Sequence, residues 1–248
     1  MRKDDDGVWY LGPEGKEPCI RLDIDKKDRS GALNMVNYFK YCNLDKHMEK
    51  GEGTRLMLKA MLLCMKQRYS SLSSIVFNDN SYIPCHGQNA ELAARNFLCY
   101  GKTWYMELGA VPVEVPIAHM YVAGARRLAA PVDQPKDAFL QTLPRQCDVA
   151  PIKALYKAAR KNRESWNVLF QRLYALDCSL FAVGSSTIRV WLVLFGIPEP
   201  SMILWHFPQD VLDAWGATYK VKQRRVRDSV GGGEWREKVG FKSYPEGR

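Results

Sequence analysis

The sequence predicts an α/β fold, in which a mixed central sheet with flanking helices is followed by a helix-rich C-terminal half. Two observations predict the sheet: residues 19–24 alternate apolar and polar side chains, and residues 73–77 form a short apolar run. A third predicts the flanking helix, because apolar residues from Leu56 to Cys64 recur at three- and four-residue spacing. The chain has 248 residues, 46% of them hydrophobic, which is enough apolar material for a folded core.

The elements of the first half follow from these patterns in chain order. They are a strand over 19–24, a charged turn over 26–31, a strand over 35–42, a polar loop over 43–53, a helix from Thr54 as its N-cap, a strand over 73–77, a loop over 84–87, a helix over 90–108 ended by Gly109, and a broken or edge strand over 111–122. The alternation of strands with one clear helix favours a sheet flanked by helices.

The second half is predicted to be mainly helical. Its expected elements are loops around one helical turn over 131–151, a long helix over 151–176, a strand or buried helix over 187–196, a loop over 198–208 with an exposed Trp205, and a short helix over 207–215. Prolines between 131 and 151 mark a boundary. We therefore expect an α/β domain over 1–130, a helix-rich extension packed on it over 131–217, and a basic flexible tail over 218–248 with Gly231–Gly233 as a joint.

Charge is concentrated at the C-terminal end. The chain has 36 Lys+Arg against 27 Asp+Glu, a formal net charge of +9, and residues 218–248 contribute nine basic and four acidic residues to these totals. Residues 220–227 are the centre of this segment, which is typical of phosphate binding, of a nuclear address or of a solvated tail. No apolar run reaches the roughly 18 residues of a membrane-spanning helix, and the acidic start excludes a secretory signal, so we expect no membrane partner.

The cysteines and histidines predict a reduced protein that binds no metal. The seven cysteines are scattered and form no Cys-x-x-Cys pair, so we expect buried thiols and an intracellular location. Structural zinc is bound by ligands in short-range pairs, which the four histidines do not supply. Cys85 and His86 are adjacent, and adjacent residues rarely point at one ion.

One motif between the predicted second strand and first helix carries chemistry: Gly51-Glu52-Gly53-Thr54. A glycine-rich turn lets the backbone approach a phosphate, and the helix N-terminus behind it offers N–H groups and a positive dipole end. The pattern predicts a diphosphate cradle, with an ordinary strand-to-helix turn as the alternative. Gly101-Lys102-Thr103 is not such a loop, because Asn96 stands where a phosphate loop has its first glycine.

Residues 49–54, the helix after them, the strand ending at Phe77 and residues 104–110 resemble the acetyl-CoA half of GNAT N-acetyltransferases. The family's pyrophosphate loop reads Arg/Gln-x-x-Gly-x-Gly/Ala. Gly51 and Gly53 match this loop, and Met48 stands at its first position. The resemblance implies that acetyl-CoA binds at Gly51, Glu52, Gly53 and Thr54.

The same resemblance assigns a role to Tyr105. Tyr105, Gly109 and Ala110 match the family's Tyr-x-x-x-Gly-Phe pattern at the end of a later helix. The resemblance implies that Tyr105 is the general acid that protonates the leaving thiolate. The alternative is an aromatic side chain that packs in the core.

A second resemblance concerns residues 77–85, 100–105 and 152–180, which are similar to uncharacterised proteins of large nucleocytoplasmic DNA viruses. Those proteins carry a Gly-Lys-Thr-Trp-Tyr-Glu signature, and here Met106 replaces the glutamate. The resemblance implies a viral origin, with the protein in the cytoplasm of the infected host cell or, if it is structural, in the virion.

Three functions remain open at this point. The first is a coenzyme-A-dependent N-acyltransferase that transfers an acetyl group to an unidentified amine. Its general base is unassigned among Glu49, Glu52, Asp79, Glu107 and His86. The second is a non-catalytic viral structural or interaction protein with the same fold and a viral protein partner. The third is a nucleic-acid-binding protein that uses residues 220–227 and the basic face of the 151–176 helix.

Overall fold

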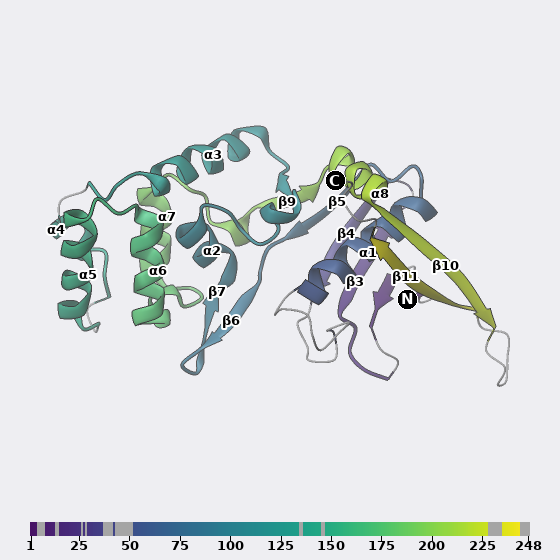
Figure 1. The fold of residues 1–248 in the computed structure, drawn as a ribbon, viewed down its shortest axis with the longest axis horizontal. Coiled ribbons are helices and arrows are strands. Elements are labelled where there is room, and N and C mark those ends of the chain that lie inside the picture. The colour runs from purple at the N-terminus through teal and green to yellow at the C-terminus, as the bar shows by residue number, and fades with distance from the viewer. Residues whose placement is uncertain are drawn as a thin grey trace. The chain divides into compact units, whose positions relative to one another are not determined.

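The computed structural model describes residues 1–3, 8–12, 15–25, 27, 29–36, 42, 52–133, 136–144, 147–227 and 235–243. The chain forms two compact units, residues 1–77 with 206–248 and residues 78–205. The predicted α/β class with a mixed sheet is confirmed (Figure 1). The chain crosses between units after Phe77 and after Trp205, whereas the sequence placed its domain boundary near residue 130.

The sheet of the first unit is mixed. Its strands are β1 (Arg2–Lys3), β2 (Val8–Leu11), β3 (Ile20–Asp25), β4 (Ser30–Val36) and β5 (Ser74–Asn78), in that spatial order, followed by β9 (Leu204–Phe207). Neighbours from β1 to β4 are antiparallel, whereas β4 and β5 are parallel, with Ser30 opposite Ser74. Parallel neighbours need a crossover connection, and helix α1 (Glu52–Arg68) lies within it.

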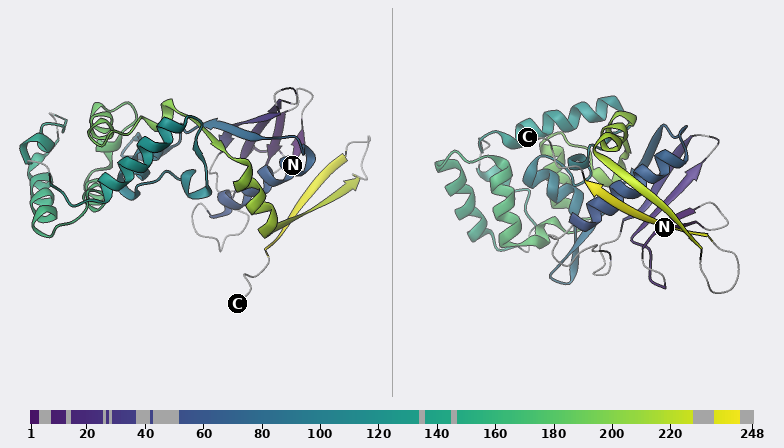
Figure 2. Two further views of the ribbon diagram at one scale, coloured as in Figure 1. Left: turned by 90° about the horizontal axis from the view of Figure 1, so that it is seen from above. Right: turned by 45° about the vertical axis from the view of Figure 1, so that its right-hand side comes forward.

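Helix α1 is buried nearly all round. Leu58, Leu62 and Met65 are fully buried, and so are Met61 and Cys64 on the rest of its circumference. A helix that is apolar on every side must be covered on every side. Helix α8 (Gln209–Thr218) and strand β10 (Tyr219–Arg227) pack on α1, and β10 pairs with β11 (Trp235–Ser243) in an antiparallel hairpin (Figure 2).

The second unit is mainly helical. Its elements are β6 (Tyr82–Cys85), β7 (Gln88–Glu91), α2 (Leu92–Tyr100), η2 (Met106–Leu108), β8 (Val111–Pro112), α3 (Val115–Ala129), α4 (Lys136–Leu140), α5 (Val149–Lys161), α6 (Trp166–Leu176), η3 (Cys178–Phe181), α7 (Ser186–Leu194) and η4 (Pro200–Met202). Aromatic rings fill its core: Phe139 stacks on Tyr156 with centroids 5.2 Å apart, and Phe170 meets Trp191 at 5.0 Å. Such ring pairs add to the stabilisation that burial alone provides.

The strand at 19–24, the helix after 54 and the strand at 73–77 are confirmed within one or two residues by β3, α1 and β5. Two details differ. Strand β4 begins at Ser30, in the predicted turn, and only residues 35, 36 and 42 of the predicted strand are described. The prediction that Thr54 is the N-cap is wrong, because α1 already includes Glu52.

Turns account for the corrections between residues 84 and 122. The loop expected at 84–87 is the tip of the β6–β7 hairpin, closed by Cys85 opposite Gln88. The helix expected to reach 108 ends at Gly101, whose φ of 73° is left-handed and whose N–H donates to the carbonyl of Phe97 at 2.7 Å. The broken strand expected over 111–122 gives way to α3, with Pro116 in its first turn, where proline loses no hydrogen bond.

Similar breaks shape the rest of the chain. The long helix expected over 151–176 is two helices, α5 and α6, separated by Arg163 with a φ of 53°. The apolar segment at 187–196, expected as a strand or a buried helix, is the helix α7.

Trp205 is fully buried rather than exposed, because its indole N–H donates to the Pro200 carbonyl at 3.1 Å and its ring meets that of Tyr121. The expected flexible tail contains the β10–β11 hairpin, and Gly231–Gly233 lies outside the described residues.

Candidate functional sites

The N-terminus of α1 is the first candidate site. The parallel strand β4 precedes it and the parallel strand β5 follows it, so β4, α1 and β5 form a βαβ unit. In such units ligands bind outside the carboxyl ends of the strands, where helix N-termini present unpaired N–H groups. Glu52, Gly53 and Thr54 form the first residues of the helix, and Gly51 lies just outside the described residues.

Thr54 gives this helix end an unusual feature. Its side chain is 4% exposed, and its hydroxyl oxygen Oγ1 has no hydrogen-bond partner in the structure. A buried hydroxyl without a partner costs free energy, so such groups are rare unless a ligand or water satisfies them. The predicted diphosphate cradle thus contains an unsatisfied polar group in its first turn.

Tyr105 lies in the second unit, whereas residues 52–54 lie in the first. Its ring is 8% exposed and packs edge-on against Trp104, with centroids 4.8 Å apart. Burial raises the pKa of the Tyr105 phenol, and the nearby charge of Asp79 raises it further. The tyrosine thus has the surroundings of a core aromatic, and its hydroxyl keeps its proton at neutral pH.

Two buried carboxyl groups lie in the same unit as Tyr105. Asp79 is 1% exposed; its Oδ1 accepts hydrogen bonds from the hydroxyl and the N–H of Ser81, at 2.5 and 3.3 Å, and its Oδ2 has no partner. Burial raises its pKa. Glu91 is 5% exposed at the N-cap of α2, and its Oε1 also has no partner. The pair forms a buried acidic cluster that the sequence did not identify.

The pKa of Glu91 is raised to about 7, first by burial and then by the charges of Glu199 and Asp79. Arg189 opposes this shift and forms an ion pair with Glu199, with Nε 3.1 Å from Oε2. A carboxyl group that titrates near neutral pH is able to accept and release a proton under physiological conditions. Of the general bases left open by the sequence, Asp79 is the one that belongs to this cluster.

The Gly101-Lys102-Thr103 segment has a structural role. Gly101 ends α2, and a Cβ added there would lie 3.5 Å from Ala125. Thr103 is fully buried, and its Oγ1 accepts a hydrogen bond from the N–H of Met106 at 3.2 Å, at the start of η2. The segment therefore closes one helix and opens the next.

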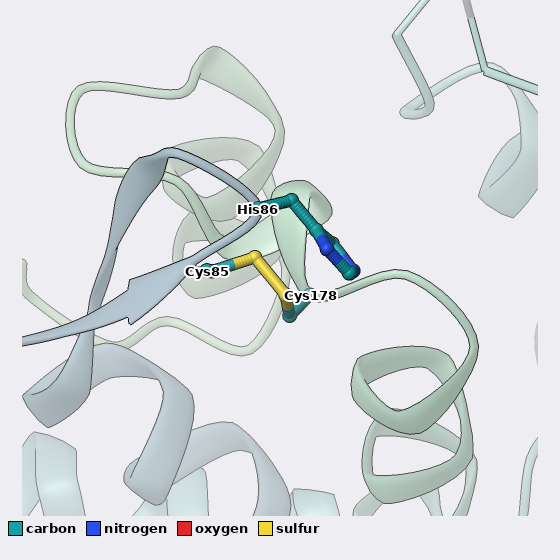
Figure 3. A group of neighbouring side chains, drawn as sticks. All are labelled: Cys85, His86 and Cys178. Carbon is teal, nitrogen blue, oxygen red and sulfur yellow. A yellow bond between two sulfur atoms is a disulfide. The ribbon is translucent and has the colours of Figure 1, made fainter.

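A second group of polar side chains appears at the tip of the β6–β7 hairpin. Figure 3 shows Cys85 and Cys178 joined by a disulfide, with the imidazole of His86 beside it. One ligand atom of each of the three residues lies within 4.8 Å of the other two. Cys85 is buried, Cys178 is partly exposed and His86 is exposed.

The prediction of reduced thiols is wrong for four of the seven cysteines. Cys19 bonds to Cys42 and Cys85 bonds to Cys178, while Cys64, Cys99 and Cys147 are not in disulfides. Cys85 and Cys178 are 93 residues apart in the chain, so no local cysteine spacing predicted their disulfide. The argument that placed the protein in a reducing compartment therefore loses its support.

No helix in the part of the chain that the structure describes is long and apolar enough to cross a membrane.

The site residues predicted from the sequence lie in two places, at the start of α1 and in the core around Tyr105. The structure adds Glu91 as a second buried carboxyl, and it adds Cys178 as the partner of Cys85. Compared with known proteins, the chain matches no family model, no curated protein and no solved structure.

Proposed function

We propose that the first unit binds the diphosphate of acetyl-CoA at the N-terminus of α1, and that the protein transfers the acetyl group to an amine. The observation that supports this proposal is the parallel β4–α1–β5 unit, whose helix begins at Glu52, directly after Gly51. A phosphate at this position would receive hydrogen bonds from the N–H groups of the first turn and would meet the positive end of the helix dipole.

The residues present fit a phosphate group. The unpartnered hydroxyl of Thr54 is a donor that a phosphate oxygen would satisfy. Gly53, in the first turn, has no side chain that would block the approach of a large ligand to the backbone.

The coenzyme would supply an acyl group activated as a thioester, and the chain would supply binding and a proton. Residues 52–54 bind and orient the diphosphate. Tyr105 holds a proton on its phenolic oxygen at neutral pH, as phenols ordinarily do, and burial and the charge of Asp79 raise its pKa further. A general acid releases its proton most readily when its pKa lies near the working pH, so the raised pKa of Tyr105 weakens it in the role that the resemblance implies.

Calorimetric titration with acetyl-CoA, with free adenine nucleotide as the control ligand, tests the proposal. We expect a low-micromolar dissociation constant, about 8 kcal/mol of binding free energy. Gly53→Asp should abolish binding without unfolding, since an acidic residue in the first turn favours the helix but repels a phosphate. Glu52→Gln should strengthen binding by removing a negative charge. If no heat is measured, the acyltransferase proposal fails, and the non-catalytic viral scaffold takes its place.

The β10–β11 hairpin favours nucleic-acid binding as a second candidate function. Lys220, Lys222 and Arg224 stand at alternate positions along β10. Lys220 pairs with Lys242 and Arg224 with Lys238, so both strands have cations at paired positions. A two-stranded ribbon fits the major groove of duplex DNA, and cations at regular spacing neutralise its phosphates. Duplex DNA binding that weakens steeply with added salt is the expected result, and binding that is independent of salt would exclude this function.

A further inference from the structure

We propose that Cys85, Cys178 and His86 bind one zinc-type divalent ion once the Cys85–Cys178 disulfide has been reduced. The two sulfurs and an imidazole nitrogen already lie within 4.8 Å of one another. Two sulfurs bound to a tetrahedral zinc, each about 2.3 Å from the ion, are about 3.8 Å apart. Breaking the S–S bond lets the sulfurs separate to that distance while the two Cα atoms stay 6.0 Å apart.

The hairpin turn places the histidine beside the sulfurs. Cys85 pairs with Gln88, and the two residues between them, His86 and Gly87, have φ values of 46° and 79°. This is the left-handed turn that suits a two-residue hairpin. Histidine is one of the few non-glycine residues that adopt it with any frequency. In Figure 3 the imidazole leans over the disulfide towards Cys178.

The two cysteines are held together by more than their own bond. The backbone N–H of Val183 donates to the carbonyl of Asn89 at 2.7 Å, and Ala90 and Ala182 form an isolated bridge, so β7 is joined to the segment after η3. At the other end of η3, Asp177 accepts hydrogen bonds from the N–H and the hydroxyl of Ser179, at 2.9 and 2.6 Å. These contacts do not involve the sulfurs, so we expect them to persist after reduction.

The donor set and its exposure fit a zinc-type ion. Two thiolates and one imidazole form a donor set that binds zinc in preference to magnesium or calcium, which favour oxygen ligands. His86 is exposed and Cys178 is partly exposed, which gives an ion access from solvent. Three protein ligands leave the fourth tetrahedral position to water or to a ligand from a partner.

The chemistry balances in two steps. A dithiol transfers two electrons and two protons to the disulfide; its own sulfurs become oxidised to a disulfide, and Cys85 and Cys178 become thiols. The ion then displaces one proton from each thiol into solvent and accepts the lone pair of the neutral imidazole. The oxidised form has no thiolate to offer, so the redox state decides whether the ion binds.

Cobalt spectroscopy of the full chain tests the proposal. The protein is reduced with a trialkylphosphine, which becomes the phosphine oxide with an oxygen from water, and is then titrated with Co²⁺. We expect one equivalent of cobalt to bind with the intense visible bands of a tetrahedral sulfur-ligated site, and zinc to displace it. The untreated protein should show no such bands. A reduced protein that shows none either would overturn the proposal.

Variants separate this site from the other thiols. His86→Asn keeps a residue that tolerates the left-handed turn but removes the imidazole, and it should weaken cobalt affinity at least about tenfold. Cys178→Ser should abolish the bands. Cys147→Ser, and Cys19→Ser combined with Cys42→Ser, should leave them unchanged. Bands that survive His86→Asn and Cys178→Ser, or that disappear with the Cys19 and Cys42 changes, would contradict the assignment.

Discussion

Gly124 in α3 lies so close to Ile197 that a Cβ added at residue 124 would be 2.5 Å from Cγ1 of Ile197. The same Cβ would lie 3.1 Å from Cδ1 of that isoleucine and 3.5 Å from the Phe195 carbonyl oxygen. Both Gly124 and Ile197 are buried, so neither can shift into solvent. The glycine therefore sets the distance between α3 and the segment that follows α7.

Gly124→Ala should destabilise the second unit by about 1–2 kcal/mol. The cost of forcing a methyl group into a filled space, about 1–3 kcal/mol, exceeds the gain of up to about 1 kcal/mol from replacing a helical glycine. Gly216→Ala in α8 is the control, because its Cβ would meet only Leu63 at 3.8 Å, and it should stabilise the first unit by about 0.5–1 kcal/mol. Thermal denaturation of both variants measures the effect, and equal shifts of the melting temperature in the same direction would refute this account.

Glu91 should make stability fall as pH rises between about 4.5 and 7. Its pKa is raised from 4.5 to about 7 in the folded protein. In this window the unfolded chain has released the proton that the folded protein still holds, so a rise in pH favours unfolding; above the folded pKa the effect is complete.

Glu91→Gln should remove this dependence and raise the free energy of unfolding above neutral pH relative to the parent protein. Urea denaturation at several values of pH measures it. Glu114→Gln is the control, since Glu114 is exposed and its replacement should leave the pH profile unchanged. A Glu91→Gln profile that parallels that of the parent protein would show that another group titrates in this window.

Thr54→Val should separate ligand binding from stability. The hydroxyl of Thr54 is buried and unpartnered, so replacing it with a methyl group of similar shape should leave stability unchanged or raise it by about 1 kcal/mol. If the hydroxyl binds a phosphate, the same change should weaken acetyl-CoA affinity about tenfold, the equivalent of about 1.4 kcal/mol. Calorimetry and thermal denaturation of one preparation measure both, and an unchanged affinity would remove Thr54 from the site.

Tyr105→Phe should lower kcat for acetyl transfer by about 10²–10⁴-fold if the phenol acts as general acid, with coenzyme affinity unchanged. Phenylalanine keeps the ring that packs against Trp104. A variant with full activity would assign Tyr105 to the core alone, as its burial favours.

DNA binding by the hairpin should depend on which positions along β10 have cations. Replacing Lys222 and Arg224 with glutamine should weaken binding and reduce the slope of log affinity against log salt by about 1.8, because each lost phosphate contact contributes about 0.9. Arg225→Gln with Arg227→Gln is the matched control, since these residues alternate with the first set along β10. Equal effects of both sets, measured by fluorescence anisotropy, would show that net charge matters and the positions of the cations along the strand do not.

Local patterns were enough to predict much of the scaffold and part of the first candidate site. Alternation predicted β3, and helical spacing predicted α1 and therefore the position of its N-terminus beside Gly53. Both signals arise within one element, where the backbone period decides which side chains share a face. The turns were harder, because the left-handed residues Gly101 and Arg163 interrupt helical patterns that look continuous in the sequence.

The buried carboxyls needed the fold. Asp79 sits in an Asn-Asp-Asn segment that predicts an exposed turn, yet it is almost completely buried. Glu91 follows an unremarkable polar segment, and its pKa depends on Glu199, more than a hundred residues away. The turn between β6 and β7 did have a local signal, because His86-Gly87 between two extended segments is compatible with a two-residue hairpin.

The sequence by itself determined the α/β class, the places of β3, α1 and β5 and the basic character of residues 220–227, because composition and periodicity are properties of neighbouring residues. Only the tertiary structure decided that β4 and β5 are parallel neighbours, that Trp205 is buried and that Cys85 meets Cys178. These are contacts between residues far apart in the chain. Their free energy comes from burial and pairing across elements, and no pattern within either element records it.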